Sequence, residues 1–236
     1  GYKVISQAAD NKVTQQQSQI DAMVQQGAKV IVVGPVDGKQ LGPVLKYAKD
    51  AGILILGYDR LIENTEAIDG VVQFGAVRTG ELQGQSLLDG LAELKGGGPY
   101  NIELFGGGPA DPNAPLFFEG AMKVLQPKID DGTLKVVSGQ KDFSQVVTQD
   151  WKAENAQRRM DSLLTSTYSS AELDGVLSPN DTLARAIITS AYSDALVPIF
   201  LYVVPLLVVG FVLMLTLKEH PLATKVNHTG HPGDTV

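Results

Sequence analysis

Short apolar runs alternate with amphipathic stretches over the first two-thirds of the chain. Runs rich in Val, Ile and Leu lie at 29–33, 53–57, 70–74, 101–105, 135–137 and 175–177. Continuous apolar runs of this length are typical of strands that are buried on both faces of a parallel sheet. The pattern therefore predicts six parallel strands.

The stretches between these runs have helical periodicity. Residues 14–26 place Ile20, Met23 and Val24 on one stripe and end at Gly27, a typical helix stop. Residues 41–51, 79–94 and 151–164 show the same pattern. Strands alternating with helices at this spacing predict right-handed βαβ units, that is, a doubly wound α/β fold.

The segment Lys-Gly-Gly-Gly-Pro at 95–99 interrupts this alternation. Because it has no side chains to pack and a proline that breaks helices, it predicts a hinge. We therefore expect a first lobe at 1–95, a hinge at 96–100 and a second lobe at 101–190. Each lobe has only about three predicted strands, few for an open sheet, so both lobes are expected to be incomplete.

The stretch 195–217 contains no charged residue. At about 1.5 Å per helical residue it is long enough to cross a hydrocarbon core of roughly 30 Å. It predicts a transmembrane helix, with a buried core helix as the alternative. Lys218 and Lys225 weakly favour a cytoplasmic C-terminus. The polar tail 218–236 is predicted to be disordered.

Composition excludes several classes of function. The formal charge of −7 lacks the basic footprint that nucleic acid requires. The chain has no cysteine, and its three histidines (220, 228 and 231) follow the predicted span. A thiol nucleophile and a Ser–His relay in the lobes are therefore excluded. We expect no enzyme activity, no metal and no cofactor, although paired acids are not excluded by composition.

Asp59 and Arg60 follow the predicted strand 53–57 directly. Ligands of open α/β sheets bind beyond the carboxyl ends of the strands. A carboxylate accepts hydroxyl hydrogens and a guanidinium donates a fork of N–H groups, so the pair suits a polyhydroxylated ligand. A solvated loop ion pair is the alternative.

Further candidates lie in the second lobe. In Ser-Pro-Asn-Asp at 178–181, Asn180 is assigned to ligand and Asp181 to the cap of a helix at 182–190. In the glycine-rich turn 106–113, Asp111 and Asn113 either cap the next helix or reach the ligand. Trp151, the only tryptophan, suits stacking on a sugar ring, with core packing as the alternative.

These motifs together resemble a known family. The segments GAKVIVVGPVDGKQLGPVLKYAKDAGILILGYDRLI, GGGPADPNAPLFFEGAMKVLQP, TQDWKAENAQRRMDSLL and LSPNDTLARAIITS are similar to periplasmic sugar-binding proteins of ABC transporters, in the xylose-binding and ChvE-like multiple-sugar-binding group. The resemblance covers residues 1–190. It implies a type I periplasmic-binding-protein fold that binds an aldose such as xylose, glucose or galactose for ABC import or chemosensing.

The resemblance also implies ligand residues, partners and a location. Asp59 and Arg60 would contact the sugar from the first lobe, and Asn113, Trp151 and Asn180 from the second. An ABC permease would be the protein partner. The lobes would lie in the periplasm or on the outer face of the cytoplasmic membrane, anchored through 195–217.

The sequence departs from the family pattern at both ends. Members of the family have further strands before residue 1 and after residue 190, so the chain is expected to be truncated. From about residue 191 it instead resembles the last transmembrane helix of a major facilitator efflux transporter. A fusion is therefore expected, and a transporter fragment with an appended α/β domain is the alternative function.

Overall fold

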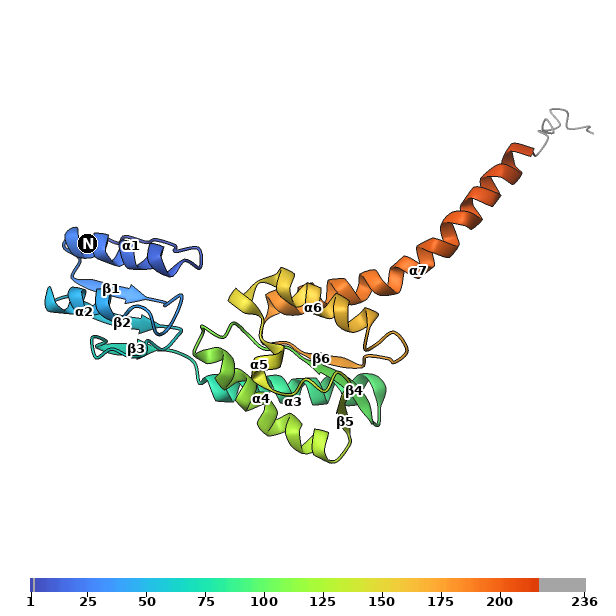
Figure 1. Cartoon of the computed structure of the whole chain (residues 1–236), viewed down its shortest axis with the longest axis horizontal. Helices are drawn as coiled ribbons and strands as arrows, with labels where there is room; N and C mark the ends of the chain where they lie inside the picture. The colour runs from blue at the N-terminus through green and yellow to red at the C-terminus, as the bar shows by residue number, and fades with distance from the viewer. Residues whose placement is uncertain (2, 217–236) are drawn as a thin grey trace, which may run out of the picture. The chain divides into compact units, whose positions relative to one another are not determined.

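The computed structural model describes residues 1 and 3–216 (Figure 1). The helices are α1 (Val13–Gln25), α2 (Gly42–Asp50), α3 (Ala76–Lys95), α4 (Asn113–Asp130), α5 (Phe143–Val146), the 3-10 turn η1 (Gln149–Trp151), α6 (Ala153–Thr165) and α7 (Asp181–Thr216). The strands are β1 (Val30–Val33), β2 (Leu54–Tyr58), β3 (Gly70–Val72), β4 (Tyr100–Leu104), β5 (Leu134–Val136) and β6 (Gly175–Leu177). All strand pairs are parallel, which confirms the predicted α/β class.

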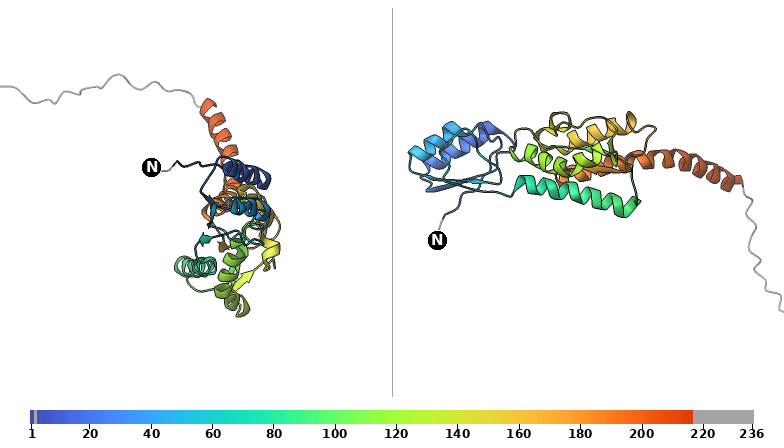
Figure 2. Two further views of the ribbon diagram at one scale, coloured as in Figure 1. Left: turned by 90° about the vertical axis from the view of Figure 1, so that its left-hand side faces the viewer. Right: turned by 90° about the horizontal axis from the view of Figure 1, so that it is seen from below.

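The first sheet has the strand order β1-β2-β3. Its inward side chains, among them Ile31, Val33 and Ile55, share one core with α1 and α2, and both helices lie on the same side of the strands (Figure 2, right). Val30 and Val32 point the other way and are 49% and 62% exposed. The prediction of strands buried on both faces is wrong for this sheet, because no described helix covers its second face.

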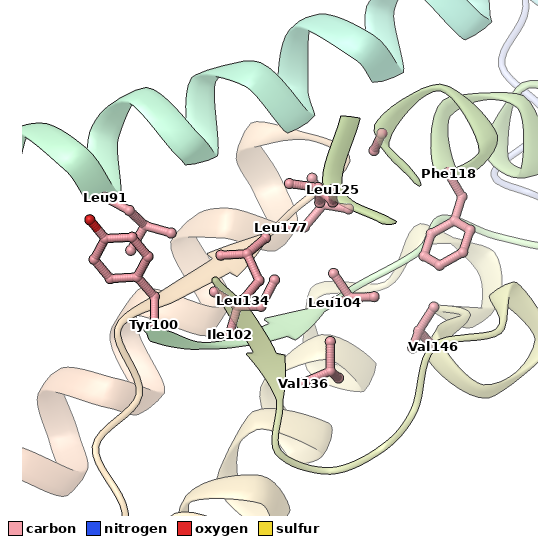
Figure 3. Packing of buried hydrophobic residues seen from close by; sticks show 11 residues of the cluster. Leu91, Tyr100, Ile102, Leu104, Phe118, Leu125, Leu134, Val136, Val146 and Leu177 are labelled. Carbon is pink, nitrogen blue, oxygen red and sulfur yellow. The ribbon is translucent and has the colours of Figure 1, made fainter. Parts of the chain in front are cut away.

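The second sheet has the order β5-β4-β6 and is covered on both faces. One core joins it to α3 and α4 through residues such as Leu91, Ile102 and Leu125 (Figure 3). The other core joins Phe105 to α6 and to the first turns of α7. Burial on both faces explains why β4 has an apolar sequence.

Helix α3 belongs to this second sheet. Its Leu91 packs with Tyr100 and Ile102, whereas the first core ends at Ala67 and Ile68. The hinge was predicted at 96–100. In the structure, the chain passes from the first hydrophobic core to the second before α3 begins. Local sequence could not assign α3, because an amphipathic stripe does not specify which sheet it covers.

Glycines let α3 and α4 approach closely. A Cβ at Gly80 would collide with the carbonyl oxygen of Phe117, and one at Gly120 with that of Val77. Gly90, also in α3, faces open space. The two helices therefore pack backbone against backbone at the positions of Gly80 and Gly120.

We expect Gly80→Ala to lower the free energy of unfolding by about 3 kcal/mol, because the methyl group must push the helices apart. Gly90→Ala is the matched control and should raise stability by about 0.5–1 kcal/mol, since alanine is the better helix former. Urea titration of both variants measures the difference. Equal stability of the two variants would contradict the close helix contact.

The C-terminal part differs from its prediction. A helix at 182–190 and a span at 195–217 were expected as separate elements, whereas the structure has one helix, α7, from Asp181 to Thr216. Among residues 1 and 3–216, no helix is both long enough and apolar enough to cross a membrane. The expected membrane anchor is therefore not supported. Residue 217 and the predicted disordered tail 218–236 lie outside the described residues.

Candidate functional site

Four of the five candidate residues lie beyond the carboxyl ends of the strands. Asp59 and Arg60 follow β2, Asn113 is the first residue of α4, after the turn that follows β4, and Asn180 follows β6. Trp151 ends η1, one residue before the N-cap of α6, and not in that helix as predicted. Apart from Trp151, these positions agree with the rule that ligands meet parallel sheets at this edge.

Asp59 and Arg60 present different groups. The side chain of Asp59 is 54% exposed, whereas that of Arg60 is 24% exposed. The Nε of Arg60 lies 3.8 Å from Asp59 but only 2.7 Å from the carboxylate of Asp111. Its Nη1 donates to the carbonyl oxygens of Pro35 and Val36, at 3.2 and 3.4 Å. The predicted loop ion pair is therefore a minor contact, and Asp59 keeps an accessible carboxylate.

Asn113 links the two sheets. Its Nδ2 donates to the backbone carbonyl of Asp59 at 2.7 Å. Its Oδ1 is buried and accepts no hydrogen bond from the described residues, and the whole residue is only 5% exposed. A buried acceptor without a donor costs free energy. This oxygen is therefore suited to receive a hydroxyl hydrogen from a ligand.

The indole ring of Trp151 packs against two glycines. Its ring lies against Gly107 and Gly108, where a Cβ on Gly107 would collide with the six-membered ring. The sequence correctly predicted a glycine-rich turn. Gly107 and Gly108 are needed there because the indole ring leaves no room for a side chain. Its Nε1 donates to Asp111 Oδ2 at 3.1 Å, so the indole N–H is already used.

Two of the five candidates have strained backbones. Asp59 has φ +67° and Trp151 has φ +56°. Positive φ is tolerated by aspartate but is an outlier for a bulky aromatic residue. Such strain is concentrated at functional sites, where surrounding contacts maintain it.

Asn180 caps the N-terminus of α7, a role that the sequence predicted for Asp181. Its Oδ1 accepts the backbone N–H of Leu183 at 2.9 Å, so Asn180 caps α7 and Asp181 is the first helical residue. The cap assignment to Asp181 is therefore corrected. Among the described residues, no hydrogen bond or ion pair joins Asn180 to the other four candidates. Its contact with ligand remains a prediction.

Asp111 is the residue that the sequence left undecided. Its buried carboxylate connects Arg60, Asn113 and Trp151. Burial raises its pKa above the ordinary value, although the Asn113 N–H and the charge of Arg60 act in the opposite direction. The sequence shows Asp111 two residues before Asn113, but it does not show that Arg60 and Trp151 contact Asp111 in the folded chain.

Similarity to known proteins extends over most of the chain. The family model described as "Periplasmic binding protein domain" matches residues 1–211. The multiple sugar-binding periplasmic receptor ChvE of Rhizobium radiobacter is 46% identical over 190 residues, covering 80% of this chain and 54% of the relative. The D-xylose-binding periplasmic protein of Escherichia coli K12 is 37% identical over 196 residues, covering 83% and 55%. The chain thus spans about half the length of these relatives.

Solved structures agree with this similarity. An ABC transporter solute-binding protein from Clostridium phytofermentans with bound β-D-glucose has a TM-score of 0.77 and 40% identity, covering 82% of this chain and 60% of that one. A carbohydrate transporter solute-binding protein from Chloroflexus aurantiacus, in complex with D-glucose, has a TM-score of 0.67 and 32% identity, covering 77% and 57%.

The family match also corrects the expected fusion. It continues to residue 211, about twenty residues past the junction expected near residue 191. The resemblance of the C-terminal segment to an efflux transporter is therefore not supported.

Proposed function

Because the chain belongs to the periplasmic binding protein family, we propose that it binds a monosaccharide, an aldose such as glucose, xylose or galactose. The observation that carries this proposal is the cluster of Asp59, Arg60, Asn113 and Trp151, which Asp111 and its neighbours connect. The cluster combines an exposed carboxylate, a guanidinium, a buried unpaired acceptor and an aromatic ring.

Each group matches one part of a sugar. The Asp59 carboxylate accepts hydroxyl hydrogens, and the Nη2 of Arg60 donates to a hydroxyl or ring oxygen. The Oδ1 of Asn113 accepts a further hydroxyl hydrogen. The Trp151 ring offers an apolar face for the C–H side of the pyranose. Asn180 is proposed as an additional donor through its amide nitrogen.

We further propose that binding serves ABC import or chemosensing on the periplasmic side of the membrane, with an ABC permease as partner. The solved relative from Clostridium is described as an ABC transporter solute-binding protein. The sequence relatives are named for sugar binding and not for catalysis, which supports a role without enzyme activity.

Isothermal titration of the full chain with D-glucose, D-xylose and D-galactose tests the proposal. We expect saturable 1:1 binding of at least one aldose, with a dissociation constant near the micromolar range, about −8 kcal/mol. Mannitol, an open-chain polyol without a ring to stack on Trp151, is the control and should bind far more weakly. If none of the three aldoses gives a binding heat at millimolar concentration, the proposal is wrong.

A further inference from the structure

The carboxylate of Asp111 receives donors from both halves of the site. Its Oδ2 accepts from Arg60 Nε at 2.7 Å and from Trp151 Nε1 at 3.1 Å. Its Oδ1 accepts from the backbone N–H of Asn113 at 2.9 Å. The side chain is only 6% exposed. Both oxygens are therefore engaged within the protein.

These contacts decide which groups of the neighbours remain for a ligand. Arg60 uses its Nε on Asp111 and its Nη1 on backbone carbonyls, so the Nη2 is left. Trp151 uses its only side-chain N–H, so the face of its ring is left. The orientation of both side chains is thus set by hydrogen bonds that do not involve a sugar.

The same contacts cross between the two sheets. Arg60 follows β2 of the first sheet, whereas Asp111 and Trp151 follow β4 and α5 of the second half. Two hydrogen bonds run beside the ion pair: the side-chain Nδ2 of Asn113 donates to the Asp59 carbonyl, and the Gly38 N–H donates to the Ala110 carbonyl. Asp111 is the charged centre of this connection.

We infer that Asp111 is a positioning residue: before any sugar binds, its hydrogen bonds hold the side chains of Arg60 and Trp151 in the orientation in which they contact the ligand. We call these hydrogen bonds the clasp. This role rests on the proposed function for its ligand. Binding residues that are already fixed lose less conformational entropy when the ligand arrives, so preorganisation increases affinity. A buried carboxylate also carries a desolvation cost, which charged donors such as Arg60 offset.

The test is Asp111→Asn in the full chain. The amide keeps the size of the side chain but loses the charge, and its nitrogen cannot accept from Arg60 or Trp151. Because Trp151 is the only tryptophan, intrinsic fluorescence reports on the clasp directly. Without sugar, we expect a shifted emission maximum and stronger acrylamide quenching. With D-glucose, calorimetry should show affinity reduced by about tenfold or more.

Asp174→Asn is the matched control. Asp174 is also a shielded carboxylate, 12% exposed, and it accepts from Lys95 Nζ and from the backbone N–H of Asn101, both at 2.7 Å. It touches none of the candidate site residues. We expect this variant to lower the urea midpoint while Trp151 emission, quenching and glucose affinity stay as in the unchanged protein.

The outcomes separate the alternatives. If Asp111→Asn lowers only the urea midpoint, as Asp174→Asn does, Asp111 is structural and the inference is overturned. If the unchanged protein binds no aldose, the proposed function fails, but the sugar-free fluorescence still decides whether the clasp exists.

Should Asp111→Asn not fold, Asp111→Glu replaces it, because one extra methylene displaces the carboxylate. Unchanged emission and quenching in that variant would also overturn the inference.

Discussion

Asp59→Asn should weaken aldose binding by about 100-fold or more, corresponding to roughly 3 kcal/mol lost from hydrogen bonds to a charged acceptor. Asparagine is preferred to alanine here, because Asp59 has φ +67° and asparagine tolerates that conformation. The Asp59 carbonyl keeps its bond from Asn113. The loss therefore reports on the carboxylate alone, measured by calorimetry with D-glucose.

The expected loss of affinity does not come from Arg60. Asp59 is not the main partner of Arg60, since Asp111 lies closer to its Nε. Arg60 therefore stays paired in the variant, and the missing acceptor accounts for the effect. Asp89→Asn is the control, because Asp89 is exposed on α3 and, among the described residues, its carboxylate bonds only to the side chain of Gln85. If glucose affinity is the same in both variants, Asp59 is not a ligand residue.

The strands were predictable because the apolar runs are short and bounded by polar turns. The run at 175–177 coincides with β6, and the others begin or end within two residues of their strands. The sequence of a strand does not predict which faces of its sheet are covered by helices. Val30 and Val32 look like the buried residues of β4, but no described helix packs on them.

The site was predictable to the extent that chemistry follows the strand ends. Asp59 and Arg60 were predicted as ligand residues because they directly follow an apolar run, whereas Asn113 was assigned to ligand only through the family resemblance; their contact with a ligand remains a prediction. The role of Asp111 was left undecided between a helix cap and a ligand contact, because its partners Arg60 and Trp151 are 51 and 40 residues away in sequence. The helix that was predicted to begin at Trp151 begins two residues later, at Ala153, since the turn after α5 requires a positive φ at Asp150 and Trp151 that periodicity does not reveal.

Glu103→Leu should lower the free energy of unfolding by about 4 kcal/mol, because it removes the centre of a buried polar network. Glu103 is fully buried in β4 and accepts from the Ser138 N–H at 3.0 Å, from the Ser138 hydroxyl at 2.7 Å and from the Tyr168 hydroxyl at 2.8 Å. Arg159 lies 3.8 Å away. Urea unfolding followed by Trp151 fluorescence measures the loss.

Tyr168→Phe separates the carboxylate from its individual donors. Burial, followed by the hydrogen bond to Glu103, raises the pKa of the Tyr168 hydroxyl above its ordinary value, so this group remains a donor. Removing it deletes one hydrogen bond, and we expect a loss of about 1 kcal/mol. Glu103→Leu costs more because it leaves the Arg159 guanidinium, which also stacks on Phe105 at 4.3 Å, without its carboxylate. If the two variants lose similar stability, the charge of Glu103 contributes nothing beyond a single hydrogen bond.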